Sequence, residues 1–337
     1  MSTEPDRALA SAHHPAQRAD VSATTHTPPA PRWWDRSANK GLVLGLLGVA
    51  LFAATLPMTR LAVGTVDAPL MSGVFVAMGR AVVAAALSVL FLLATRAPLP
   101  GREDLWPLAI TSAGVVFGFP LFSSVAMRYV EAVHASVIVG VLPLATAAAG
   151  ALLHRQRPST GFWACAALGS GLVVAFAVLR SGSAGLSVHP ADLLLLAAML
   201  CAAVGYAYGA RLSQHMRAEH VICWALVIAL PITLPMAFAT RPQEALPASA
   251  WWGFAYTAVF SMWLGFFAWY RGLALGGTVR VSQVQLVQPF LSMLFAVPLL
   301  GERLDAVTLG FAVAVIATVF MGKKMPVQAT ATRIERH

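Results

Sequence analysis

The chain has 337 residues, of which 58% are hydrophobic and only 11% are charged. Soluble globular domains carry about a quarter charged residues, so this composition excludes an ordinary water-soluble fold. The formal net charge is +9, but the basic residues are spread over short loops and tails and form no patch of the kind that nucleic-acid binders need. The composition predicts an all-α polytopic membrane protein whose surroundings are a lipid bilayer, with no nucleic acid among its partners.

Residues 1–39 are the first compositional unit, rich in Ala, Pro, Ser, Thr and His. They hold no sustained apolar run and are predicted to be a disordered cytoplasmic tail. They are not a secretory signal, because the first hydrophobic run starts at Gly41 and is of membrane-spanning length.

Ten apolar stretches follow, each long enough to cross a hydrocarbon core of about 30 Å. The connections between them are too short to form an extramembrane domain. The last residues, 323–337, are predicted to be a basic cytoplasmic tail. The predicted spans are 41–59, 70–94, 105–127, 133–153, 160–179, 191–210, 221–240, 249–270, 281–300 and 306–322.

The distribution of Lys and Arg predicts the orientation of these spans. Seventeen of the 23 basic residues lie in the two tails and the even-numbered connections, whereas five lie in the odd-numbered connections. Because cytoplasmic loops are enriched in Lys and Arg, both termini are predicted to lie in the cytoplasm, with the protein in the cell (inner) membrane.

An internal repeat becomes visible when the chain is shifted by 146 residues. Trp106 then meets Trp252, and Pro143 meets Pro289. The predicted repeats are residues 40–180 and 190–322, each with five spans. Since five is an odd number, the second repeat enters the membrane from the opposite side. Two inverted five-helix repeats, ten helices in all, are an architecture typical of secondary transporters.

Three segments of the second half carry a resemblance to a known family. They are WYRGL (269–273), QPF (288–290) and GERL (301–304), and they are similar to motifs of EamA-type transporters in the drug/metabolite transporter superfamily. The first half departs from the pattern, since HRQR (154–157) stands where GERL would recur. The resemblance covers residues 41–322 and implies an exporter of small metabolites, such as amino acids or related amphipathic compounds.

Arg80 is the most informative candidate for substrate binding, because it lies near the middle of the second predicted span. An ionised guanidinium at that depth is costly unless it faces a polar cavity or a partner. One interpretation is that Arg80 attracts an anionic group of the substrate. The alternative is that it binds backbone carbonyls freed near Pro57 or Pro143, or reaches the membrane surface.

Spans four and nine contain mid-span prolines, Pro143 and Pro289. A proline removes a backbone donor and disturbs the helix before it, which exposes carbonyl groups to a cavity. The pair is therefore predicted to mark hinges that line a cavity. Gln285 and Gln288 share a helix face close to Pro289 and are predicted to bind substrate there, although glutamines also bridge neighbouring helices.

Aromatic side chains supply the remaining candidates. Trp263 and Phe267 lie four residues apart in span eight and suit an aromatic wall for a substrate, although ordinary helix packing explains them too. Tyr206 in span six has the same two interpretations. No catalytic residue, metal site or cofactor is predicted, because Cys165, Cys201 and Cys223 lie in apolar spans without paired spacing.

The acidic residues decide between classes of function. All fourteen lie in tails, connections or span ends, so no carboxylate relay for proton coupling is expected at mid-depth. The leading hypothesis is a secondary transporter of a small-molecule substrate that works by alternating access. The alternative is a sugar, nucleotide-sugar or multidrug carrier of the same superfamily. An intramembrane enzyme or a channel is a less favoured alternative. The sequence leaves open whether the protein forms a homodimer.

Overall fold

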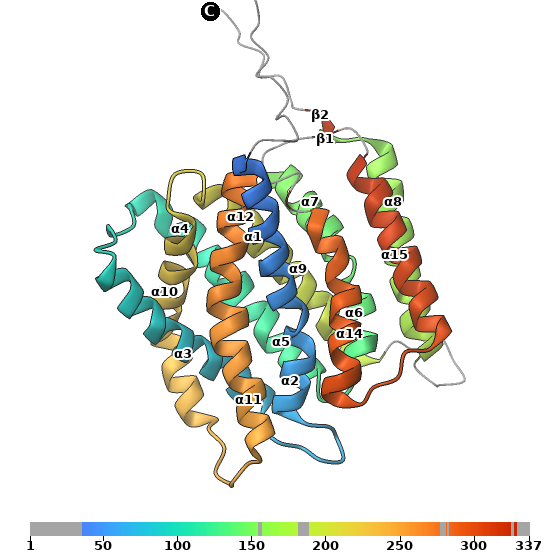
Figure 1. Cartoon of the computed structure of the whole chain (residues 1–337), viewed down its shortest axis with the longest axis horizontal. Helices are drawn as coiled ribbons and strands as arrows, with labels where there is room; N and C mark the ends of the chain where they lie inside the picture. The colour runs from blue at the N-terminus through green and yellow to red at the C-terminus, as the bar shows by residue number, and fades with distance from the viewer. Residues whose placement is uncertain are drawn as a thin grey trace, which may run out of the picture.

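The computed structural model describes residues 36–153, 157–180, 189–276, 281, 283–324 and 327–328. These residues form a bundle of helices (Figure 1). The exception is a short antiparallel pair of two-residue strands, β1 (Arg157–Pro158) and β2 (Val327–Gln328). Residues 1–35 of the expected N-terminal tail, and 325–326 and 329–337 of the C-terminal tail, lie outside the described residues.

The helices of the first half are α1 (Arg36–Ala53), α2 (Thr55–Val63), α3 (Gly73–Ala94), α4 (Arg102–Thr111), α5 (Phe119–Ala126), α6 (Ala132–Val139), α7 (Leu142–Leu153) and α8 (Thr160–Arg180). A π-helical segment, η1 (Ser112–Gly118), joins α4 to α5. The last four residues of the expected tail, 36–39, belong to α1.

The helices of the second half are α9 (Pro190–Leu212), α10 (Ala218–Ala239), α11 (Ala248–Tyr256), α12 (Gly265–Gly276), α14 (Gln288–Leu300) and α15 (Ala306–Lys324). The π-helical segment η2 (Thr257–Leu264) joins α11 to α12, and the 3₁₀ segment η3 (Gln283–Val287) precedes α14.

Many of these helices are apolar enough to cross a bilayer. Seven helical stretches of the described residues have the necessary length and composition, and three shorter apolar helices coincide with the fifth, ninth and tenth predicted spans. The chain is therefore a polytopic helical membrane protein, while the count of ten spans stays a prediction. The seven stretches are 39–63, 73–94, 102–126, 132–153, 190–212, 218–239 and 248–275.

Helix boundaries repeat along the chain with the 146-residue spacing noted in the sequence. Helix α4 begins at Arg102 and α11 at Ala248, and both are continued by a π-helical segment. Helix α7 likewise begins at Leu142 and α14 at Gln288. π-Helical segments are rare and often mark functional sites. Their occurrence after α4 and after α11 matches the spacing of the predicted internal repeat.

The two halves are interleaved in the bundle. Helix α1 packs against α12, α3 against α10, α8 against α15, and both α5 and α7 against α9. Small residues permit close contacts between helices. A Cβ atom on Gly272 would lie 2.7 Å from the backbone nitrogen of Gly45, and one on Gly114 would overlap the Cys201 carbonyl oxygen. The main hydrophobic core of the bundle is thus built by both halves.

The bundle has two ends, which we name by the chain termini. Helix α1 starts and α15 finishes at the terminal end, drawn at the top of Figure 1. The connections from α2 to α3 and from α14 to α15 lie at the opposite, distal end. The polar contacts described below fall into three groups: one at each end and one between them.

Candidate functional site

Arg80 lies about two turns into α3. The N-terminus of this helix is capped by Ser72, whose hydroxyl accepts a hydrogen bond of 3.0 Å from the Phe75 amide. The Arg80 residue is only 2% exposed, and its Nε and Nη1 atoms are buried without a hydrogen-bond partner among the described residues. A buried guanidinium that leaves donors unused is available to bind a group that enters from outside.

The pocket at Arg80 combines this cation with aromatic and hydroxyl groups. Tyr206 of α9 lies in the lining, with its ring centroid 5.9 Å from that of Phe266. Thr55 and Ser261 contribute hydroxyls that hydrogen-bond each other at 2.7 Å. The lining therefore offers one positive charge, neutral polar groups and apolar ring faces to a ligand.

A second pocket lies where spans four and nine are interrupted. Pro143 and Pro289 are the second residues of α7 and α14, a position at which the missing backbone donor costs little. Both helices therefore restart at their prolines. Pro143, Pro289, Gln285 and Gln288 all line this pocket. Gln285 is 2% exposed, and both polar atoms of its amide are buried without a partner among the described residues.

The two pockets adjoin, since Phe52, Phe119, Leu142 and Gln288 line both. We call them together the central cavity. Each has a volume of about 20 Å³, whereas sites for small molecules have volumes of about 300–1,000 Å³. The structure is therefore closed around its centre, and a ligand enters only if helices move apart.

A much larger cavity of about 780 Å³ lies at the distal end. Its lining includes Arg60, Glu131, Glu302 and Arg303. Arg60 lies one helical turn beyond Leu56, which lines the central cavity. The distal cavity is thus a wide, charged vestibule one helical turn away from the closed central cavity.

Helix α6 is held to the second half by a carboxylate in this vestibule. The Glu302 side chain accepts hydrogen bonds of 2.8 Å from the Ala132 and Val133 amides, the first two of α6. Gly301 has a φ of 68° and ends α14, so the chain turns toward α6 at this point. Burial raises the pKa of the Glu302 carboxyl above its ordinary value, against the opposing effects of the two amides and Arg60.

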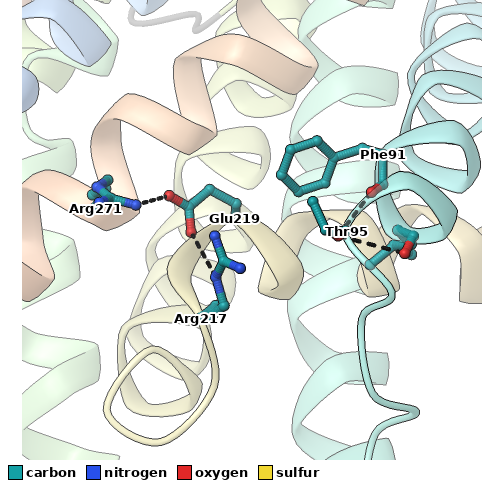
Figure 2. Close-up of polar contacts among 6 residues, drawn as sticks. Phe91, Thr95, Arg217, Glu219 and Arg271 are labelled. Atoms are coloured by element: carbon teal, nitrogen blue, oxygen red, sulfur yellow. Dashed lines mark hydrogen bonds and ion pairs between the residues drawn. The ribbon is translucent and has the colours of Figure 1, made fainter.

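At the terminal end, an ion pair links α10 to α12 (Figure 2). The Glu219 carboxylate accepts a hydrogen bond from the Arg271 guanidinium and lies 4.0 Å from Nε of Arg217. Close by, the Thr95 hydroxyl donates to the Phe91 carbonyl oxygen at 2.8 Å (Figure 2). Glu219 lies in the first turn of α10 and Thr95 follows the end of α3. Arg271 lies within α12, because this helix continues beyond the predicted end of span eight at residue 270.

The structure brings most of the predicted site residues together. Six of them line the central cavity: Arg80, Tyr206, Gln285, Gln288, Pro143 and Pro289. The aromatic pair of span eight is placed elsewhere. Trp263 and Phe267 have ring centroids 4.8 Å apart and pack around Phe91, and neither lines the central cavity. Their position agrees with the alternative interpretation of this pair, which is ordinary helix packing.

One buried contact was not foreseen from the sequence. Nε2 of His134 lies 2.7 Å from Oδ1 of Asp192, which is 1% exposed. Asp192 is one of the acidic residues that the sequence places at the end of a span, and His134 was not among the candidate residues. A signal existed: His134 and Asp192 lie in the first turns of spans four and six, which start at the same side of the membrane in the predicted topology. The described residues contain no group of three or more metal-ligand side chains.

Comparison with known proteins agrees with a polytopic helical membrane protein. The model of the EamA-like transporter family matches residues 39–179 and again residues 189–322. The chain is 40% identical over 288 residues to the "Uncharacterized transporter YdeK" of Bacillus subtilis (strain 168), covering 85% of this chain and 98% of the relative. A solved structure described as "Crystal structure of protein" shares the fold with a TM-score of 0.56 at 18% identity, covering 84% of this chain and 96% of that one.

These matches define the class of protein: a multi-pass membrane transporter. The chain belongs to the EamA-like transporter family, as the GERL, QPF and WYRGL segments had indicated.

Proposed function

We propose that this transporter exports small amphipathic metabolites that carry a carboxylate, amino acids among them, through the central cavity. The single observation that carries the proposal is the buried Arg80 guanidinium with two unpartnered nitrogen atoms in the cavity wall. A carboxylate matches a guanidinium in charge and in hydrogen-bond geometry. The aromatic lining then accommodates the apolar part of the substrate.

The neutral polar groups of the cavity complete the binding site in this proposal. The Gln285 amide has both a donor and acceptors free, and the Gln288 side chain lines both pockets. The lining residues contain no Asp or Glu. A purely cationic compound would therefore meet an uncompensated positive charge, and this argues against the multidrug alternative for cationic drugs.

The mechanism we propose is alternating access by two inverted five-helix repeats. Support comes from the two family matches on one chain and from the 146-residue spacing of the starts of α4 and α11 and of α7 and α14. Inverted repeats exchange conformations around a site between them. In this scheme Pro143 and Pro289 are equivalent hinges, and the terminal end faces the cytoplasm, as the basic loops indicate.

The first test identifies the substrate. Metabolites are compared inside and outside cells that overexpress the protein and cells that lack it, and the compounds that change are tested with the purified protein in proteoliposomes. We expect carboxylate-bearing compounds to accumulate outside the overexpressing cells. Their methyl esters, which lack the negative charge, should compete poorly for transport. Equal competition by ester and acid would refute the role of the carboxylate, and enrichment of sugars or nucleotide-sugars would favour the alternative carrier.

A further inference from the structure

The distal vestibule is large enough to hold a small molecule in the structure as it stands. Its volume is about 780 Å³, which falls in the range of about 300–1,000 Å³ that is usual for small-molecule sites. Glu131, Ser249 and Arg303 of its lining are exposed, so the vestibule is accessible from the surrounding water. A ligand therefore reaches this cavity without any movement of the helices, in contrast to the closed central cavity.

Two arginines and three acidic side chains line the vestibule, and three of these five already have partners. Glu302 accepts hydrogen bonds from the first two amides of α6 with its two carboxylate oxygens. Nη1 of Arg60 donates to two carbonyl oxygens of the connection between α5 and α6. Asp305 accepts a hydrogen bond of 2.7 Å from the Thr308 amide and caps the start of α15. These three side chains stabilise the wall of the vestibule.

The other two charged side chains, Glu131 and Arg303, have opposite charges and are exposed. Neither makes a hydrogen bond or an ion pair with another residue in the part of the chain that the structure describes. Glu131 lies within electrostatic range of Arg60 and Glu302, but it is not in hydrogen-bond contact with them. The vestibule thus offers one carboxylate and one guanidinium to a ligand.

Glu302 brings these two groups to the same part of the vestibule. It precedes Arg303 in the chain, and its Oε1 atom lies 2.8 Å from the amide nitrogen of Ala132, the residue after Glu131. Arg303 and Glu131 are therefore each one residue away from a direct hydrogen bond between the α14–α15 connection and α6. Both side chains line the same cavity from adjacent parts of its wall.

The lining also contains apolar surface, which Leu61, Leu70 and Leu300 contribute. A ligand with an apolar part is stabilised when it buries that part against them. A purely anionic ligand would meet three acidic side chains, and a purely cationic ligand would meet two arginines. A zwitterion instead matches charges of both signs. The chemistry that fits the vestibule is therefore a small molecule with an ammonium group, a carboxylate and an apolar side chain.

We infer that the distal vestibule is a second binding site, separate from the central cavity, for α-amino acids with apolar side chains. Arg303 binds the carboxylate, Glu131 binds the ammonium group, and the leucines contact the apolar side chain. The inference goes beyond the proposed function, because a ligand reaches the vestibule without passing Arg80. In the proposed orientation the site faces the outside of the cell.

The test measures binding to the vestibule with purified full-length protein in phosphatidylcholine nanodiscs. Cys165, Cys201 and Cys223 are replaced by Ala, and Val66→Cys then carries an environment-sensitive fluorophore. Val66 is 57% exposed and follows Thr65, which lines the vestibule. Added leucine should change the fluorescence in a saturable way.

A control label reports on the other end of α3. The same fluorophore is attached to Leu99→Cys, since Leu99 is 82% exposed and lies in the connection from α3 to α4. Because the vestibule lies beside the connection that precedes α3, this label should not respond to leucine.

Two relatives of leucine test the need for both charges. Leucine methyl ester keeps the ammonium group and lacks the carboxylate, whereas 4-methylpentanoate keeps the carboxylate and lacks the ammonium group. Both compounds retain the apolar side chain. Each should bind about threefold to fivefold more weakly than leucine, as expected for the loss of one exposed ion pair.

Variants assign each charge to a residue. Arg303→Gln should weaken leucine binding about threefold to fivefold and leave binding of the methyl ester unchanged. Glu131→Gln should weaken leucine binding to the same extent and leave binding of 4-methylpentanoate unchanged. Arg241→Gln and Glu244→Gln are matched controls, because both residues are exposed in the α10–α11 connection at the same end of the bundle (Figure 1) and neither belongs to the lining. Both controls should bind leucine like the wild type.

Three results would overturn the inference: no saturable response of the label at Val66, equal affinities for leucine and its two relatives, or Arg303→Gln and Glu131→Gln proteins that bind leucine like the controls. A leucine response abolished by added phosphatidylethanolamine, whose headgroup joins an ammonium group to a phosphate, would also overturn it and assign the vestibule to a lipid. Since none of these measurements involves transport, each such result would leave the proposed role of Arg80 untouched. Conversely, loss of the carboxylate preference in transport would leave binding to the vestibule unaffected.

Discussion

Replacing Arg80 by Gln tests the proposed binding site most directly. The side chain is 2% exposed, and its Nε and Nη1 atoms have no partner in the described part of the chain. Glutamine keeps a polar group near the cavity and removes the positive charge. Because Arg80 makes no ion pair among the described residues, the substitution leaves no buried carboxylate behind.

The magnitude follows from the contact that Arg80 is proposed to make. A hydrogen bond to a charged group contributes about 1.5–3 kcal/mol, so the apparent Km for a carboxylate substrate should rise about tenfold to hundredfold. Folding should respond in the opposite direction or not at all. An unpaired buried charge is itself costly, so its removal is expected to leave the melting temperature unchanged or to raise it.

The assay is uptake into proteoliposomes of a substrate found in the metabolite comparison, with thermal unfolding of the same preparations in detergent. Arg96→Gln is the matched control, since Arg96 follows the end of the same helix and is exposed; it should transport like the wild type. Arg80→Lys should restore part of the affinity, because lysine retains the charge without the planar fork of donors.

The opposite pattern would refute this reasoning. If Arg80→Gln unfolds at a much lower temperature while the folded fraction transports with the wild-type Km, then Arg80 stabilises the bundle and does not bind substrate. The same conclusion would follow if Arg80→Lys unfolded at the same lowered temperature as Arg80→Gln and transported with the wild-type Km.

Three further predictions concern the ends of the bundle. Burial raises the pKa of the Glu302 carboxyl above its ordinary value of 4.5, so the folded state binds the carboxyl proton more tightly than the unfolded state does. The melting temperature of the wild type should therefore fall as the pH rises through this raised pKa. Glu302→Gln has no carboxyl to titrate and should lose this trend. Glu219→Gln removes the charge that binds Arg271. Because the Glu219 side chain is only 10% exposed whereas that of Arg271 is 52% exposed, the free energy of unfolding should decrease by about 1.5–3 kcal/mol; an unchanged value in denaturant titrations would contradict this. A reporter that is active only in the cytoplasm should be active when fused after His337, and activity of an export-dependent reporter there would contradict the proposed orientation.

The periodic features of the sequence were sufficient to predict the class of fold. Apolar stretches of spanning length predict a polytopic helical bundle because a bilayer requires each crossing segment to satisfy its own backbone hydrogen bonds. The prolines predict where two spans break, since α7 and α14 restart at Pro143 and Pro289. The π-helical segments η1 and η2 could not be predicted, because they depend on how neighbouring helices pack rather than on local propensity.

The positions of the candidate site residues could be predicted where a polar side chain falls at mid-span. Arg80 and Gln285 are polar residues at mid-span, and a bilayer leaves them no inexpensive position other than a cavity or a partner. Trp263 could not be placed in the same way, because an aromatic side chain is equally suited to a cavity wall and to a packed cluster. The pairing of His134 with Asp192 required knowledge of which helices are neighbours, which composition and spacing do not provide.

The hydrogen-bond partners of charged and polar side chains differ between the ends and the centre of the bundle. At each end a buried or half-buried carboxylate has partners: Glu302 accepts from the α6 amides and Glu219 from Arg271. At the centre, the nitrogen atoms of Arg80 and the amide of Gln285 are buried without partners among the described residues. Unpaired buried polar groups are destabilising unless a ligand binds them. In the function proposed above, a substrate that reaches the centre of the bundle supplies the hydrogen-bond partners that Arg80 and Gln285 lack.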